Sequence, residues 1–151
     1  MTRLGALVAK ARASRRGAAL EIAAIALVSY VPFLLSSPGD VPADTKQYLF
    51  LDPDRLLSRA PYMWDPHIGA GTVPHQNIGY LFPMGPFFWV LEHLGVPDWV
   101  AQRLWLGSLT FAAALGVRWL FGMLGIRRAG VLAGIAVYIL TPYQLSFTAR
   151  M

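Results

Sequence analysis

The segment Leu104–Val117 contains no charged residue and lies between Arg103 and Arg118. In an α-helix, which rises about 1.5 Å per residue, these two arginines lie roughly 22 Å apart. Long basic side chains extend toward water, so each guanidinium can reach its own side of a hydrocarbon core about 30 Å thick. Tryptophans near both ends would lie at the two interfaces. The sequence therefore predicts a membrane-spanning helix over residues 98–125.

Two further apolar runs predict two more spans. The first, over residues 18–36, is interrupted only by Glu21, which we place at the membrane interface, and follows a basic segment, residues 1–17. A cleaved signal peptide is the alternative for this run, since a basic stretch also precedes the apolar core of such peptides. The second run predicts a helix over residues 130–147, after a short connection at 126–129. Together the runs indicate an integral membrane protein with about three transmembrane helices.

The charges are divided between the segments that separate these runs. Five basic residues precede the first run, and Arg127 and Arg128 separate the second from the third. Seven of the eight acidic residues lie between Asp40 and Asp98. Because cytoplasmic loops are enriched in Lys and Arg, this pattern predicts a multi-pass plasma-membrane protein with a cytoplasmic N-terminus. Residues 37–97 then form an extracytoplasmic loop.

The overall composition excludes some classes of protein. Only 14% of the residues are charged, against roughly 25% in average soluble chains. The formal charge is +5, but the basic residues are segregated as membrane topology requires and are not interleaved with aromatic residues. We therefore expect no nucleic-acid partner. Membrane lipid is an expected partner, and the basic cytoplasmic face makes an acidic cytosolic protein a further candidate. The chain has no cysteine, which excludes disulfides and zinc–thiolate sites.

The extracytoplasmic loop has its own local signals. Asp52 followed by Pro53 predicts the start of a short helix, with Asp52 as the N-cap. Residues 66–79 are rich in Gly, Pro and Asn and are expected to be irregular. Residues 80–94 are apolar and aromatic but contain two prolines, which predicts a helix lying in the outer interface. The predicted fold class is all-α, a polytopic membrane protein with interfacial helices in the loop.

Asp44 is the candidate catalytic residue that we favour in this loop. It lies about nine residues beyond the first predicted span, where a carboxylate could face a substrate delivered from the bilayer. Such a group could serve as a general base, because a hydroxyl is a poor nucleophile until a base accepts its proton. The alternative is that Asp44 caps the following helix. Spacing does not decide between Asp44 and Asp40, although Asp40 follows a glycine and fits a turn.

Other polar residues are candidates for binding. His67 and His75 lie near Asp65, Gln76 and Asn77 and could hydrogen-bond a sugar or hold a metal ion, but their spacing is not a metal-binding motif. We therefore assign no metal ligand and no cofactor, and divalent metal dependence stays open. Arg103 could hold the phosphate of a lipid-linked substrate, with extension toward the interface as the alternative.

The loop and second span resemble a known family. The most specific segments are Asp44-Thr45-Lys46, the Gln76-Asn77 pair followed by Gly79-Tyr80-Leu81-Phe82-Pro83, and the run from Gly95 to Trp105. From Asp44 to Gly107 the sequence is similar to the N-terminal part of actinobacterial membrane arabinofuranosyltransferases. These enzymes introduce alpha-1,3 branches into the arabinan of the cell wall.

The resemblance implies the N-terminal part of a C-type glycosyltransferase (GT-C) fold, with the active site on the extracytoplasmic side. It implies decaprenyl-phosphate arabinofuranose as donor, arabinan as acceptor, and inversion by one direct displacement. Asp44 would be the base, and Arg103 could stabilise the departing phosphate. The remaining residues expected to bind substrate are Lys46, His75, Gln76 and Asn77.

Two alternatives remain at this stage. The same fold could transfer another polyprenyl-linked sugar such as mannose, or the chain could be a non-catalytic membrane subunit that binds glycan or a partner. The resemblance covers only the first spans of the family, so we expect this 151-residue piece to be inactive by itself.

Overall fold

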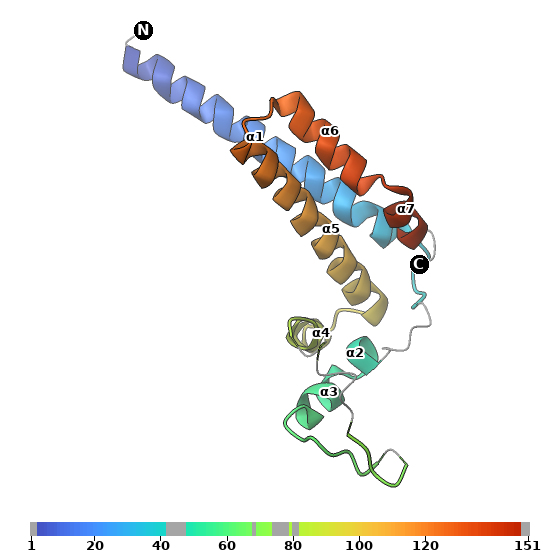
Figure 1. The fold of residues 1–151 in the computed structure, drawn as a ribbon. Coiled ribbons are helices and arrows are strands. Elements are labelled where there is room, and N and C mark those ends of the chain that lie inside the picture. The colour runs from blue at the N-terminus through green and yellow to red at the C-terminus, as the bar shows by residue number, and fades with distance from the viewer. Residues whose placement is uncertain (1–2, 42–47, 68, 74–78, 80–81, 149–151) are drawn as a thin grey trace. The chain divides into compact units, whose positions relative to one another are not determined.

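A computed structural model describes residues 3–41, 48–67, 69–73, 79 and 82–148 (Figure 1). Within these residues every regular element is a helix, and one isolated bridge pairs Asp65 with Thr72. The predicted all-α class is confirmed for this part of the chain. The helices are α1 (Arg3–Leu35), α2 (Tyr48–Leu51), α3 (Pro53–Arg59), α4 (Met84–His93), α5 (Asp98–Met123), α6 (Arg128–Ile139) and α7 (Pro142–Thr148).

The chain divides into two compact units, one formed by residues 1–36 and 106–150 and the other by residues 37–105. The first unit contains α1 and most of α5, the two longest helices among the described residues. Residues 16–35 of α1 and all of α5 are long and apolar enough to cross a membrane, whereas α6 has 12 residues. The structure therefore supports a membrane protein with two candidate spans among the described residues, and the third span stays a prediction.

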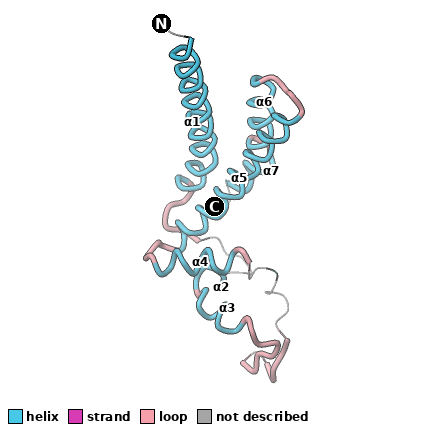
Figure 2. Tube along the Cα trace, turned by 90° about the vertical axis from the view of Figure 1, so that its left-hand side faces the viewer, coloured by secondary structure: helices cyan, strands magenta, loops and turns pink. Residues whose placement is uncertain are grey.

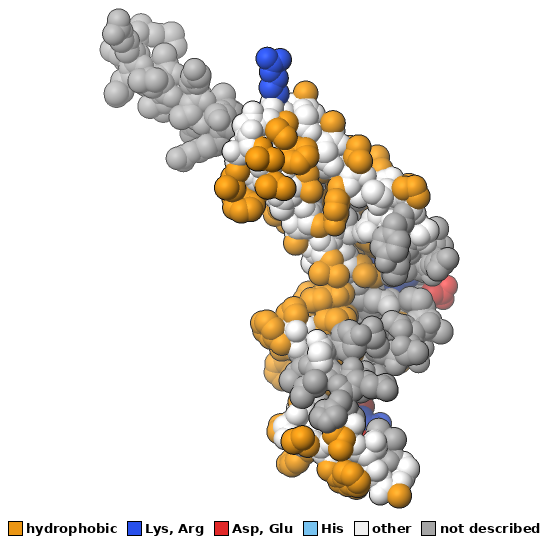
Figure 3. Space-filling model, in the orientation of Figure 1, with side chains coloured by type: hydrophobic (Ala, Val, Ile, Leu, Met, Phe, Trp, Pro, Cys, Tyr) orange, Lys and Arg blue, Asp and Glu red, His pale blue; other side chains and the backbone are white. Residues whose placement is uncertain are grey.

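The core of the first unit joins α1, α5 and α6. Ile25 of α1 and Ala114 of α5 pack with three α6 residues spaced four apart, Val131, Ile135 and Ile139. Residues four apart lie on one face of a helix, so α6 uses one face for packing. Many large apolar side chains on these helices are also exposed, among them Leu20, Trp119 and Val137, and Figure 3 shows several orange patches of apolar side chains on the face in view. An apolar exterior is what contact with lipid requires.

A charged network ties the three helices together. The Arg118 Nε of α5 donates to Oε1 of Glu21 at 2.9 Å, and the Arg128 Nε of α6 lies 3.2 Å from the other carboxylate oxygen. The Glu21 side chain is only 9% exposed. Buried charges in membrane helices are costly unless they are paired, so this network explains how Glu21 is tolerated inside a predicted span.

Two neutral hydrogen bonds add to this packing. The Tyr30 hydroxyl lies 2.9 Å from the Ser108 Oγ, joining α1 to α5. The side-chain amide of Gln144 in α7 donates to the Thr110 Oγ1 of α5 at 2.7 Å. Gly107 lies directly against the Tyr30 ring, and a Cβ at this position would overlap it. A glycine is therefore required for the close approach of α1 and α5 at this level.

The third apolar run differs from the prediction. We expected one helix over residues 130–147, but α6 ends at Ile139 and α7 begins at Pro142. Proline cannot donate a helical hydrogen bond and disfavours the helical conformation of the residue before it. At the first position of α7 the missing N–H costs nothing, and the Thr141 Oγ1 caps this turn by accepting from the Gln144 N–H at 3.4 Å.

The second unit has a smaller core. Leu49 of α2, Phe88 of α4 and Ala101 near the start of α5 are buried together. The predicted cap is present, since Oδ1 of Asp52 accepts from the Arg55 N–H at 3.0 Å and Pro53 occupies the first position of α3. The apolar segment predicted over residues 80–94 contains a helix, α4, over a shorter range.

Candidate functional site

The structure describes one of the predicted substrate-site residues, Arg103. Asp44, Lys46, His75, Gln76 and Asn77 lie outside the described residues. Their assignment to catalysis and binding therefore stays a prediction. Arg103, the remaining member of that set, lies in the second unit, within the first turns of α5.

Arg103 is fully buried and makes several contacts within its unit. Its Nη1 donates to the Trp99 carbonyl at 3.1 Å and lies 3.3 Å from the Gln102 Oε1. Its Nη2 donates to the Ser37 carbonyl at 3.1 Å, just after the end of α1. The guanidinium also lies 5.4 Å from the centre of the Trp99 ring. Arg103 thus fixes the start of the chain segment that leads to Asp44, a structural role that the sequence did not indicate.

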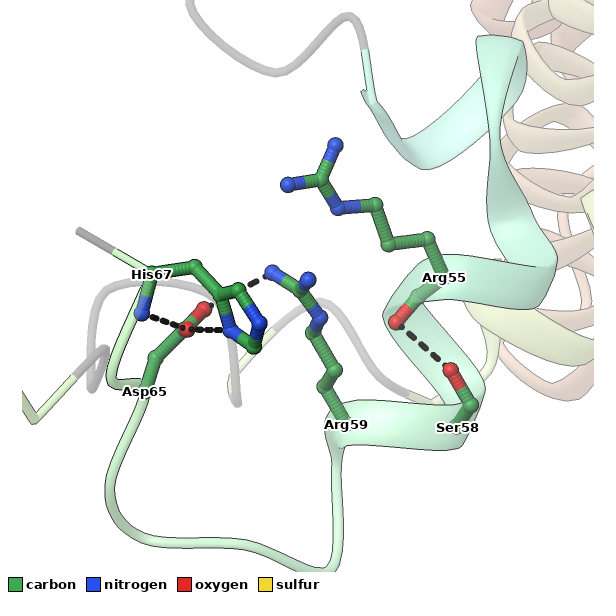
Figure 4. Close-up of polar contacts among 5 residues, drawn as sticks. All are labelled: Arg55, Ser58, Arg59, Asp65 and His67. Atoms are coloured by element: carbon green, nitrogen blue, oxygen red, sulfur yellow. Dashed lines mark hydrogen bonds and ion pairs between the residues drawn. The ribbon is translucent and has the colours of Figure 1, made fainter.

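A second group of polar residues lies at the end of α3 and in the loop that follows it, which is drawn in pink in Figure 2. Figure 4 enlarges this group. Asp65 is the centre of this group, and its side chain is 8% exposed. Oδ1 accepts from the His67 N–H at 2.9 Å and lies 3.0 Å from the His67 Nδ1, while Oδ2 accepts from the Arg59 Nη1 at 2.9 Å. Both carboxylate oxygens are therefore occupied by groups of the protein itself.

These contacts change the acidity of Asp65. The pKa of this carboxyl lies below its ordinary value of 3.8, mainly because the His67 N–H donates to it. Burial acts in the opposite direction, and the His67 side chain and the Arg59 charge lower the pKa further. The ionised form of Asp65 is thus favoured, and its carboxylate orients Arg59 and His67.

The sequence contained part of this signal. In a frequent turn motif, an aspartate side chain accepts a hydrogen bond from the backbone N–H two residues later. The segment Asp65-Pro66-His67 fits this motif. Proximity of His67 to Asp65 was expected, but the partner Arg59 was not, because its approach depends on the path of the intervening loop. A cavity of about 260 Å³ opens at this group, lined by Arg59, Tyr62, Trp64, Asp65, Pro66 and His67.

Another cluster in the second unit has the donor types that metal ions use. Potential ligand atoms of Asp54, Glu92 and His93 lie within 4.8 Å of one another, and all three residues are exposed. Trp89 contacts two of them, since its Nε1 donates to Asp54 and its carbonyl lies 2.9 Å from the His93 Nδ1. Carboxylate and imidazole groups could hold a divalent cation, but exposed clusters of this kind are also common on surfaces without one.

Comparison with known proteins gives the family. The family model described as "Alpha-(1->3)-arabinofuranosyltransferase, N-terminal GT-C domain" matches residues 28–150. An alpha-(1->3)-arabinofuranosyltransferase of Mycolicibacterium smegmatis is 38% identical over 123 residues, which are 81% of this chain and 9% of that protein. One from Mycobacterium tuberculosis is 46% identical over 90 residues, covering 54% of this chain and 6% of that protein.

The fold agrees with this match. The cryo-electron microscopy structure of the arabinofuranosyltransferase AftD from mycobacteria aligns with a TM-score of 0.71 at 38% identity, over 78% of this chain and 9% of that one. The chain thus spans less than a tenth of the length of the relatives described here. On the family match over residues 28–150, the chain belongs to the N-terminal GT-C domain family of alpha-(1->3)-arabinofuranosyltransferases.

Proposed function

We propose that this chain is the N-terminal membrane portion of an inverting glycosyltransferase. The enzyme moves arabinofuranose from decaprenyl-phosphate arabinofuranose to cell-wall arabinan and forms alpha-1,3 branches. The family match over residues 28–150 is the observation that supports this function most directly. The relatives named as alpha-(1->3)-arabinofuranosyltransferases are far longer, so the activity belongs to a complete enzyme in which this portion supplies part of the site.

The base in this reaction is Asp44. Its carboxylate accepts the proton of the acceptor hydroxyl as the oxygen attacks the anomeric carbon of the donor. The bond to the prenyl phosphate breaks in the same step, which inverts the configuration at that carbon. Lys46, His75, Gln76 and Asn77 bind substrate around this centre. The side chain of Arg103 is buried in this portion, so its positive charge stabilises the departing phosphate without direct contact.

The proposed topology places this chemistry outside the cell. Residues 1–17 and 126–129 are cytoplasmic, and three helices cross the plasma membrane. The loop 37–97 then meets a lipid-linked donor at the outer face. The exposed apolar surface of the first unit and its two long apolar helices support the membrane location.

A chimera tests the function directly. In the M. smegmatis relative, the matching N-terminal portion is replaced by this chain, and transfer of labelled arabinose to a short arabinan acceptor is measured. The matched variants are Asp44→Asn and Asp40→Asn, two acids at neighbouring places in the same loop. We expect activity in the chimera and in Asp40→Asn, and a loss of about a hundredfold or more in Asp44→Asn.

Each variant is checked for folding by its thermal unfolding midpoint. A folded Asp44→Asn chimera that keeps full activity would refute the base assignment. Activity lost in Asp40→Asn alone would move that role to Asp40. Transfer of mannose but not arabinose by the chimera would show that the donor is misassigned.

A further inference from the structure

The cavity beside Asp65 has donors that are held in place by the protein. Both oxygens of Asp65 are occupied, so this residue is not available to a ligand. One side-chain nitrogen of Arg59 (Nη1) and one of His67 (Nδ1) contact the Asp65 carboxylate. The two side chains are still 35% and 66% exposed. The contacts with Asp65 therefore leave further nitrogens of both side chains unused by that carboxylate. Fixed donors and acceptors lose little entropy when a ligand binds.

The cavity also has an aromatic wall. The Trp64 indole rests on the backbone of Gly71, where any Cβ would overlap the ring, yet the side chain is still 56% exposed. Gly71 has a φ of +106°, which a residue with a Cβ rarely adopts. Tyr62, on the same cavity, is 70% exposed. Large aromatic rings held in exposed positions are typical of recognition surfaces.

The charge of the lining indicates the class of ligand. Arg59 and Asp65 form an ion pair, so together these two groups add no net charge to the lining. An anion beside Arg59 would be repelled by the Asp65 carboxylate, which lies 2.9 Å from the guanidinium. A neutral ligand with an apolar face and several hydroxyls fits this lining. Its C–H face can stack on the Trp64 indole, and its hydroxyls can hydrogen-bond to the Arg59 guanidinium and the His67 imidazole.

We propose that this cavity is a carbohydrate subsite that binds one sugar residue of a neutral glycan chain. Because the glycan is taken to be arabinan, that part of the proposal rests on the proposed function. The subsite lies in the loop 37–97 but uses different residues from the predicted base and its neighbours. It would hold the acceptor chain through a sugar other than the one that reacts, which raises the affinity for chains over single sugars.

Saturation-transfer NMR on the whole chain in nanodiscs tests this subsite. The probe is a short arabinofuranose oligosaccharide, with a mannose oligosaccharide and inorganic phosphate as comparison ligands. We expect saturation transfer to the arabinofuranose probe in the wild type. Trp64→Ala should weaken binding by about tenfold, whereas Trp64→Phe should keep most of it because a ring remains. Gly71→Ala should also weaken binding, since it displaces the indole.

Met63→Ala is the matched control. Met63 precedes Trp64, is 72% exposed and does not line the cavity, so its loss should leave binding unchanged. Equal binding by the wild type and Trp64→Ala, or displacement of the glycan by phosphate, would overturn the subsite. Binding of the mannose probe alone, still dependent on Trp64, would support the subsite and refute the arabinan assignment. Binding of neither probe would overturn the subsite, and the chimera's transfer activity would still decide the function.

Discussion

Replacing Glu21 by glutamine should loosen the packing of α1 against α5 and α6. The wild-type carboxylate gives one oxygen to Arg118 and the other to Arg128, at 2.9 and 3.2 Å. Glutamine keeps the shape but has one acceptor oxygen and no charge, so one guanidinium loses its partner. The change therefore removes the charge and one hydrogen-bond acceptor while it keeps the size of the side chain.

The magnitude follows from the exposure of each partner. The Arg118 and Arg128 side chains are 35% and 68% exposed, while Glu21 is 9% exposed. A hydrogen bond to a charged group contributes about 1.5–3 kcal/mol, whereas an exposed ion pair contributes about 0–1 kcal/mol. We expect Glu21→Gln to lower the free energy of unfolding by about 2 kcal/mol and Arg128→Gln by less than about 1 kcal/mol.

Thermal unfolding of the whole chain in nanodiscs, followed by tryptophan fluorescence, measures these changes. At roughly 2–4 °C per kcal/mol, Glu21→Gln should unfold about 4–8 °C below the wild type. Arg118→Gln should cost more than Arg128→Gln, because it leaves the buried carboxylate with only its more exposed partner. A Glu21→Gln midpoint within about 1 °C of the wild type would refute the reasoning, as would equal costs for the two arginines.

Three further predictions concern single contacts. Gly107→Ala should push Tyr30 away from α5, break its hydrogen bond to Ser108 and cost about 1–3 kcal/mol in the same unfolding assay. Thr110→Val should remove the acceptor of the Gln144 amide and cost about 0.6 kcal/mol, an average value for such bonds between membrane helices. Because the folded-state pKa of Asp65 lies below 3.8, its stabilising effect should be complete above that pH and should disappear as the pH falls through the lowered value. Hydrogen exchange of the His67 amide against pH would show this loss, and Asp65→Asn should lack the transition.

The sequence predicted those features that depend on neighbouring residues. The uncharged stretch Leu104–Val117 and the position of Pro53 after Asp52 define α5 and the start of α3 by local rules alone. The third apolar run was predicted as one span to residue 147, whereas the structure has two helices, α6 and α7, because the hydropathy continues through Pro142 and the helical hydrogen bonding does not. Composition alone therefore gives the location of a helix better than its ends.

Contacts between distant residues were not predicted. Glu21 was expected to meet the membrane interface, but its partner Arg118 lies 97 residues along the chain, and only the packing of α1 on α5 brings them together. Arg103 was expected to extend toward an interface or bind phosphate, and its bond to Ser37 spans 66 residues. A charged residue inside an apolar run shows that a partner must exist, but it does not show which one.

The difference between local and distant contacts also determines how far a perturbation spreads. Asp65 finds Arg59 six residues before it and His67 two residues after it, and the backbone bridge to Thr72 closes the same short loop. Loss of the Asp65 charge should therefore disturb the cavity while leaving the helix packing of the first unit intact. Loss of the Glu21 charge should do the opposite, because that network joins three helices and includes no residue of the second unit. Two groups built from the same chemistry, a carboxylate with two basic partners, thus stabilise separate parts of the chain.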